Sequence, residues 1–236
     1  MAEIKVMSAG AVKSMVSALA AEFERESGDK LDLNFGTAGS LRERIKNGEV
    51  SDLVILSESA ISELAKLGLV VPESRTDLGR TVTGVAVREG APEPDISTPE
   101  AFKQALLQAR SVAYTDPKAG GSGGIMFSAL LQKLGIADEV NKKALLGKGG
   151  HDVAVSIAEG RAELGTTFIS EVLPVRGAKV VGPLPGELHN ANTYTAAVHA
   201  RAASRAGAEA LLRKLTDPAT RGRWTAAGLE PAFPAR

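Results

Sequence analysis

Apolar residues along the chain alternate between two spacings. Short runs with strand character, the first at 4–8, are each followed by a run in which apolar residues recur three and four positions apart. Met15, Leu19 and Phe23 form one such helical stripe, and Gly28 behind it is a typical helix stop. This repeated order predicts βαβ units with a largely parallel sheet, and therefore an α/β protein.

The same periodicities predict the remaining elements. Further strands are expected at 31–35, 52–56, 81–90, 112–115, 163–169, 178–186 and 192–200. Further helices are expected at 40–48, 61–68, from Pro99 onward, and at 122–135, 151–162, 204–217 and 218–229. Ser40 with Glu43 predicts a capping box at the start of its helix.

Composition narrows the function classes. The 236 residues include 28 Lys and Arg and 28 Asp and Glu, so the formal net charge of +0 disfavours nucleic acid as a partner. The sequence contains no cysteine, which excludes disulfides, thiolate nucleophiles and iron–sulfur clusters. No His, Asp and Glu cluster has metal-ligand spacing, so we expect neither a metal nor a cofactor.

The chain contains no feature of a membrane protein. Gly, Pro or a charge interrupts every apolar run before the ~20 residues that a spanning helix needs, so no membrane insertion is expected. The first ten residues have strand spacing and lack the apolar core of a secretory signal. We expect a monomer that is cytoplasmic if Met1 is native and periplasmic if an export signal has been removed.

Four junctions that lead into predicted helices consist almost entirely of small residues: 8–11, 36–40, 119–124 and 147–151. The first N–H groups of a helix lack internal partners and lie at the positive end of the helix dipole, so each junction can hold an anion. Neither G-x-G-x-x-G after the first strand nor a glycine-rich loop ending in Gly-Lys-Ser/Thr is present, which disfavours dinucleotides and nucleoside triphosphates.

The segments SAGAVKSM, FGTAGSLRERI, SDLVILSES, YTDPKAGGSGGI, DVAVSIAEGRAELGTTFISE and KVVGPLP are found in this order over nearly the whole chain. In this the chain resembles the type 2 periplasmic solute-binding proteins, most closely the molybdate-binding branch, which includes aconitate isomerase-like proteins. The resemblance implies two lobes, 1–82 with 190–236 and 83–189, each a mixed, mostly parallel sheet flanked by helices. It also implies hinge closure on a ligand in the cleft between the lobes.

The resemblance also implies a site. The hydroxyl ligands of molybdate fall on Ala11 and Ala38, the tyrosine ligand on Phe168, and the backbone ligands of the second lobe on Gly123 and Gly150. The missing hydroxyls disfavour molybdate, since each unpaired acceptor costs about 1–3 kcal/mol. The full predicted ligand-binding set is Ser8, Ala9, Gly10, Ala11, Thr37, Ala38, Gly39, Ser40, Gly121, Ser122, Gly123, Gly149, Gly150, His151 and Phe168.

Three functions follow from these residues and the resemblance. The first is binding of a small anion. An organic di- or tricarboxylate is favoured, because a site lined by glycine has more room than a molybdate site. The second is an isomerase of the aconitate type, in which His151 or Lys118 would move an allylic proton. The third is the molybdate- or tungstate-binding component of an ABC transporter, with the permease as partner if the protein is exported. Lys13 and Arg42 are additional candidates for holding a carboxylate.

Overall fold

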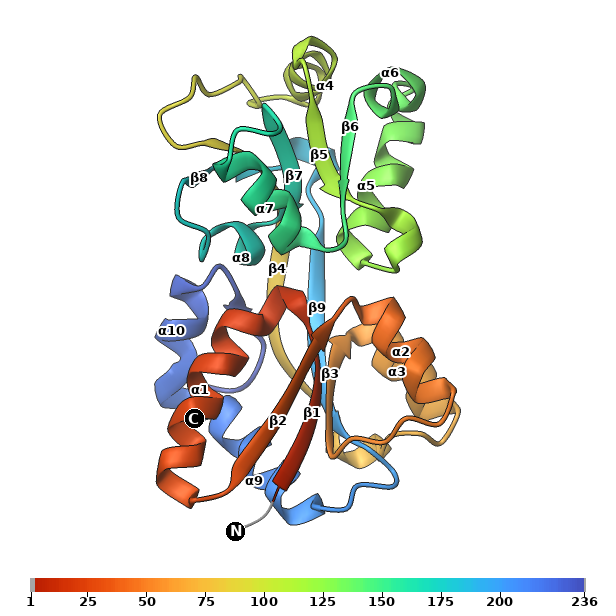
Figure 1. Cartoon of the computed structure of the whole chain (residues 1–236), viewed down its shortest axis with the longest axis vertical. Coiled ribbons are helices and arrows are strands. Elements are labelled where there is room, and N and C mark those ends of the chain that lie inside the picture. The colour runs from red at the N-terminus through yellow and green to blue at the C-terminus, as the bar shows by residue number, and fades with distance from the viewer. Residues whose placement is uncertain (1–2, 236) are drawn as a thin grey trace. The chain divides into compact units, whose positions relative to one another are not determined.

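The computed structural model describes residues 3–235, which form two compact units. Unit 1 contains the residues up to Arg80 and those from Asn192 onward, and unit 2 runs from Thr81 to Ala191. The predicted lobe boundaries, 82/83 and 189/190, differ from these by two residues, and independent movement of the lobes stays a prediction. Strands β4 (Thr76–Arg88) and β9 (Ala191–Val198) each contain a unit boundary (Figure 1).

The sheet of unit 1 has the order β2-β1-β3-β9-β4, with β10 paired to β4. Its parallel strands are β1 (Glu3–Ala9), β2 (Lys30–Gly36) and β3 (Leu53–Ser57), and its antiparallel ones are β9 and β10 (Glu230–Pro231). β3 is buried along its whole length, as expected for a strand covered on both faces.

The helices of unit 1 follow its strands. The α-helices of unit 1 are α1 (Lys13–Ser27), α2 (Ala38–Lys46), α3 (Glu58–Lys66), α9 (Arg205–Leu215) and α10 (Arg221–Ala226). Its 3₁₀ turns are Gly10–Val12, which leads into α1, Pro72–Ser74 and Pro218–Thr220. The predicted stripe of Met15, Leu19 and Phe23 is buried, and Gly28 caps α1 at a φ of 78°, a conformation that favours glycine.

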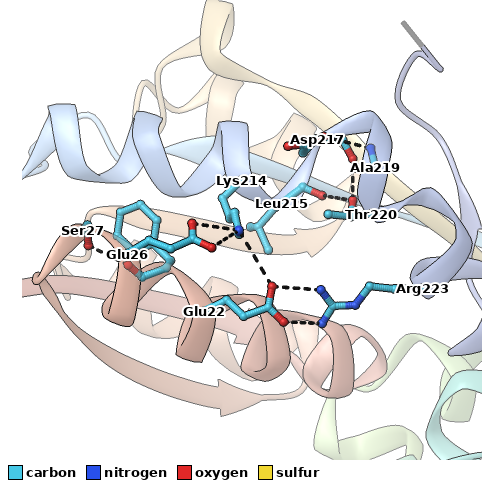
Figure 2. A network of polar contacts seen from close by, with 10 residues as sticks. Glu22, Glu26, Ser27, Lys214, Leu215, Asp217, Ala219, Thr220 and Arg223 are labelled. Carbon is cyan, nitrogen blue, oxygen red and sulfur yellow. Dashed lines mark hydrogen bonds and ion pairs between the residues drawn. The ribbon is translucent and has the colours of Figure 1, made fainter.

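An ion-pair network links α1 to the C-terminal helices of unit 1 (Figure 2). Lys214 Nζ on α9 lies 2.7 Å from Glu26 Oε1 and 3.8 Å from Glu22 Oε2 on α1, and Arg223 Nη2 on α10 lies 2.8 Å from Glu22 Oε1. The hydrogen bond from Arg223 lowers the pKa of Glu22. The buried Trp224 indole N–H on α10 donates to the Leu215 carbonyl on α9 at 3.1 Å, which joins these two helices as well.

In unit 2, both faces of the sheet are covered. Its strands are the C-terminal part of β4, β5 (Val112–Thr115), β6 (Ala144–Gly147), β7 (Leu164–Phe168) and β8 (Ala178–Pro183), with a 3₁₀ turn at Gly186–Leu188 behind them. β5, β6 and β7 are parallel, and β4 is antiparallel to β7 and β8. Val112 and Tyr114 point into one apolar cluster, whereas Ala113 points into the other, as strand alternation requires.

The helices of unit 2 supply the covering layers. They are α4 (Pro99–Gln108), α5 (Ser122–Lys133), α6 (Ala137–Asn141), α7 (Gly150–Ala158) and α8 (Ile169–Val172), with a 3₁₀ turn at Pro117–Ala119. Phe102 of α4 and Phe127 of α5 pack in one cluster, and Ile157 of α7 and Val172 of α8 pack in the other. These helices enclose the sheet of unit 2 (Figure 1).

The α/β class with mostly parallel strands is confirmed, with local corrections. The predicted capping box of Ser40 and Glu43 is wrong, because α2 begins at Ala38 and Thr37 is its N-cap. The strand expected at 163–169 ends at Phe168, where α8 follows. The elements α6, β6 and α8 were not predicted, since each has only four or five residues. In the described part of the chain, no helix combines the length and apolarity needed to cross a bilayer.

Candidate functional site

Unit 1 brings two of the predicted loops to the same edge of its sheet. The parallel register pairs Ala9 with Gly36, so the loops that follow β1 and β2 begin side by side. Ser8 pairs with Ile55 of β3, which places the start of α3 at this edge as well. The carboxyl ends of parallel strands are where open α/β sheets bind their ligands.

The N-terminus of α2 is capped by a hydroxyl of its own loop. Thr37 Oγ1 accepts the Ser40 backbone N–H at 3.2 Å, and Ser40 Oγ donates to the Thr37 carbonyl at 3.1 Å. Gly39 lies between them and is partly exposed, while Ala38 is buried. This terminus carries no ionisable cap, so its positive dipole end is offset by neutral groups alone.

The loop after β1 presents backbone rather than hydroxyl groups. Ser8 is buried, and its Oγ donates to the Ala9 carbonyl at 3.3 Å. Ala11 is buried in the 3₁₀ turn that precedes α1, and Gly10 is partly exposed. The polar groups that this loop offers a ligand are therefore those of its main chain.

Lys13 lies at the start of the helix that follows β1. Lys13, the first residue of α1, places its amino group 5.5 Å from the centroid of the Phe35 ring on β2, at cation–π distance. Arg42 instead forms ion pairs of 3.0 Å with Glu43 and with Glu63, so its guanidinium is engaged on the surface of unit 1. Of the two predicted carboxylate-binding cations, Lys13 fits this position better.

In unit 2 the loops after β5 and β6 also lie side by side. The Asp116 backbone N–H donates to the Gly147 carbonyl at 2.8 Å, which joins the two loops at the carboxyl edge of the sheet. The Asp116 carboxylate caps its own turn by accepting the Lys118 backbone N–H at 2.9 Å. The Lys118 side chain is exposed.

The start of α5 packs against the end of β7. A Cβ added at Gly123 would lie 3.2 Å from the Phe168 ring, and one at Gly124 would lie 2.3 Å from the Thr115 carbonyl oxygen. A side chain at Gly124 would therefore separate α5 from β5. Gly121 and Ser122, the N-cap and first residue of α5, are partly exposed at this end.

A carboxyl group that the sequence analysis did not include lies among the predicted residues of unit 2. Glu171 Oε2 accepts the Thr167 hydroxyl at 3.0 Å, and a Cβ added at Gly150 would lie 1.9 Å from the same oxygen. Glu171 is the third residue of α8, and its carboxyl lies against the first residue of α7.

Burial raises the pKa of Glu171 to about 7, because the carboxyl is enclosed by protein although part of the residue remains exposed. The Thr167 hydroxyl and the nearby amides of Gly150 and Phe168 lower the pKa, and the negative charge of Asp152 raises it, but both effects are smaller than that of burial. Near neutral pH this group therefore exchanges between the protonated and the ionised form.

Gly150 is required by this arrangement, whereas its neighbour is not. A Cβ at Gly150 would lie 1.9 Å from Glu171 Oε2 and 2.2 Å from Thr167 Oγ1, while a Cβ at Gly149 would meet nothing within 4 Å. His151 is exposed at the next position. The Asp152 carboxylate turns back onto the Lys148 backbone N–H at 3.1 Å.

The structure thus gathers the predicted residues into one group in each unit. In unit 2, Gly150 lies against Glu171 and Thr167, and Gly123 lies against the Phe168 ring, while the loops at 8–11 and 36–40 begin side by side in unit 1. The segment TTFISE was predicted as the end of a strand with no helix after it, so Glu171 was not singled out. The contact with Gly150 joins residues 21 positions apart, and no local pattern reveals it.

Comparison with known proteins identifies the family. The sequence model described as "Bacterial extracellular solute-binding protein" matches residues 4–230. The chain is 32% identical to aconitate isomerase from Pseudomonas sp over 97% of its length and 87% of that protein. It is 24% identical to the molybdate-binding protein ModA of Escherichia coli K12, over 83% of this chain and 77% of that protein.

The fold comparison agrees with the sequence comparison. The periplasmic molybdate-binding protein of Azotobacter vinelandii superposes with a TM-score of 0.76 at 20% identity, covering 96% of this chain and 98% of that one. This confirms the type 2 periplasmic binding protein fold that the sequence motifs indicated. The chain belongs to the bacterial extracellular solute-binding protein family, in the branch that is similar to molybdate-binding proteins and aconitate isomerase.

Proposed function

We propose that this chain binds a small organic anion with two or three carboxylates. The observation that carries the proposal is the absence of side-chain hydroxyls at the three positions where the family resemblance places hydroxyl ligands of molybdate: Ala11, Ala38 and Phe168. Ala11 and Ala38 are buried alanines in the loops of unit 1, and a Cβ at Gly123 would already contact the Phe168 ring. Main-chain N–H groups of helix N-termini and the charge of Lys13 are the donors that remain for carboxylates.

A thermal-shift screen tests this proposal. Purified protein is heated with molybdate, tungstate, sulfate, citrate, cis-aconitate and trans-aconitate in turn, each at the same ionic strength. Saturation at about 100 Kd adds about 2.7 kcal/mol to the unfolding free energy, so a specific ligand raises Tm clearly. We expect the carboxylates to shift Tm and the tetrahedral oxyanions to leave it unchanged. A shift with molybdate alone would contradict the proposal and favour the transport component of the molybdate type.

Isomerisation of aconitate is the second candidate function, and one observation favours it. The 32% identity to an aconitate isomerase extends over 97% of this chain. The reaction removes a proton from the CH₂ carbon next to the double bond and returns a proton to the former alkene carbon, so the double bond moves and the formula is unchanged. Such a step needs a base near neutrality and donors that stabilise the charge developing on the carboxylates.

His151 and Lys118 are the proton-transfer candidates of this second function. Both side chains are exposed at the loops of unit 2. Incubation with trans-aconitate, followed by chromatography, tests for the cis isomer. We expect His151→Ala to lower any turnover by about 10²-fold, whereas the matched control His189→Ala, also exposed in unit 2, leaves it unchanged. Equal turnover of wild type and His151→Ala would exclude His151 as the base.

The binding function also implies a partner and a compartment. If this chain binds its ligand without turnover, we propose that it works outside the cytoplasm and delivers the anion to an ABC transporter permease. Fractionation of the source cells with an antibody against this chain tests the compartment. Recovery of the chain in the cytoplasmic fraction would favour the isomerase instead.

A further inference from the structure

The Glu171 carboxyl occupies the place where the proposed function puts a negatively charged ligand. Gly150 is a predicted ligand-binding residue, yet a Cβ added there would lie 1.9 Å from Glu171 Oε2, so the carboxyl lies directly against the Gly150 backbone. Thr167, which is 2% exposed, donates its hydroxyl to the same oxygen at 3.0 Å. An anion that approaches this end of unit 2 therefore meets a carboxyl group of the protein.

The charges around Glu171 do not neutralise it. Its hydrogen-bond donor, the Thr167 hydroxyl, and the nearby amides of Gly150 and Phe168 are all uncharged, and no salt bridge to Glu171 occurs among residues 3–235. On α7, His151 is exposed and Asp152 adds a negative charge. On β8, Lys179 is paired with Glu93, and neither β7 nor the rest of α8 carries another ionisable side chain.

We propose that Glu171 takes up one proton from solvent when the anion binds to unit 2. In the ionised form the carboxylate lies at the N-terminus of α7 and repels the ligand. In the protonated form the carboxyl is neutral, so the repulsion disappears and its O–H becomes a donor for a ligand oxygen. This inference rests on the proposed function and adds that binding is linked to pH.

The titration range of Glu171 makes this linkage measurable. Its pKa of about 7 means that the free protein carries both forms near neutrality. If the ligand binds only the form with protonated Glu171, the apparent affinity is proportional to the fraction of the protein in that form. Between pH 6 and pH 8 that fraction drops by about tenfold, while the carboxyls of trans-aconitate stay ionised throughout.

Calorimetric titration with trans-aconitate tests the proposal. Measurements at pH 6, 7 and 8 are made in two buffers with different heats of ionisation, so that the protons taken up per anion can be counted. Wild type is expected to bind about tenfold more weakly at pH 8 than at pH 6, with nearly one proton taken up at pH 8. A residue with only a structural role would not take up a proton on binding.

Two variants and a control identify the group. Glu171→Gln keeps the shape and should bind with the same affinity at all three pH values, without proton uptake. Thr167→Val removes a hydrogen bond that lowers the pKa of Glu171, so the midpoint of the pH dependence should move upward. Glu163→Gln makes the same chemical change at an exposed acid of unit 2 that is paired with Arg110, and should behave as wild type.

The outcomes separate this inference from the proposed function. If wild type binds and Glu171→Gln retains the tenfold pH dependence, proton uptake by Glu171 is overturned and anion binding stands. If none of the screened anions binds wild type even at pH 6, the proposed function fails and this inference fails with it. Should Glu171→Gln not fold, an unchanged midpoint in Thr167→Val overturns the inference.

Discussion

The N-termini of α2 in unit 1 and α7 in unit 2 fulfil the same structural need in different ways. α2 is capped by the hydroxyl of Thr37 from its own loop, and its first residue, Ala38, carries a Cβ without conflict. α7 has no side chain at its N-cap, Gly149, and is capped by a carboxyl from α8, which leaves no room for a Cβ at Gly150. One cap is local and neutral, while the other is distant in sequence and ionisable.

This difference shows that two similar glycine-rich loops need not be equivalent anion sites. The α2 terminus offers a ligand a dipole end that is capped by the neutral hydroxyl of Thr37. The α7 terminus offers the same dipole end with a titratable group already in place. The four predictions below test this contrast in order of decreasing effect.

Gly150→Ala should have the largest effect. Because the buried Thr167 Oγ1 would lie 2.2 Å from the new Cβ, β7 or α7 must shift, and Glu171 loses its contact. We expect a loss of about 3 kcal/mol in the unfolding free energy, typical of overpacking at a tight site. Gly149→Ala is the matched control, since its Cβ would lie in open space. Equal urea midpoints for the two variants would contradict the described packing.

The second prediction concerns the pH dependence of stability. Glu171 keeps its proton up to a pKa of about 7 in the folded chain and loses it near 4.5 when unfolded, so the folded state binds more protons between these values. The stabilisation by this group is complete below about pH 4.5 and is lost as the pH rises through about 7.

Comparison with Glu171→Gln isolates this effect. Wild type should lose about 2 to 3 kcal/mol of unfolding free energy relative to the variant between pH 5 and pH 8, from the shift in pKa. Urea unfolding at both pH values measures the difference. A constant difference between wild type and Glu171→Gln would mean that the pKa of Glu171 is not raised.

Thr37→Ala tests the neutral cap of α2. Loss of the hydroxyl that accepts the Ser40 N–H should cost about 1 kcal/mol of unfolding free energy, the usual value for an N-cap. This cost should not change between pH 5 and pH 8, because a hydroxyl does not titrate there. Thr98→Ala removes an equivalent cap from α4 in unit 2 and should give a similar, pH-independent loss. A pH-dependent loss at Thr37 would remove the contrast with α7.

Lys13→Met should have the smallest effect on stability, about 0.5 kcal/mol for the cation–π contact with Phe35. Anion affinity should fall less than tenfold, and the loss should shrink as salt is added, because the lysine is exposed. Calorimetry at two salt concentrations measures both. Lys66→Met, at an exposed position in the last turn of α3, is the control and should leave affinity unchanged.

Much of the fold could be predicted from the sequence because the long helices have clear periodicity. α1 contains the expected apolar stripe and ends at Gly28, which has a positive φ. The four-residue strand β5 also begins and ends as expected, at Val112 and Thr115. Short helices such as α8 could not be predicted, since four residues contain about one helical turn and no repeated stripe.

The site could be predicted only as far as local chemistry determines it. Small residues at strand ends are visible in the sequence, and they indicated the loops that hold Gly123 and Gly150. Both Thr37 and Ser40 have side chains suited to an N-cap, so the sequence alone does not decide between them. Thr37 is the N-cap because β2 ends just before it. The role of Glu171 depends on the packing of α7 against α8, which brings together residues far apart in sequence.

Amide chemical shifts measure the central claim most directly. In a ¹⁵N-labelled sample titrated with trans-aconitate at pH 6, the account predicts the largest shifts at Gly10 and Gly39 in unit 1 and at Gly123 and Gly150 in unit 2. Saturable shifts confined to residues away from these helix N-termini, or none at all for any of the screened anions, would contradict the claim that main-chain N–H groups hold the ligand.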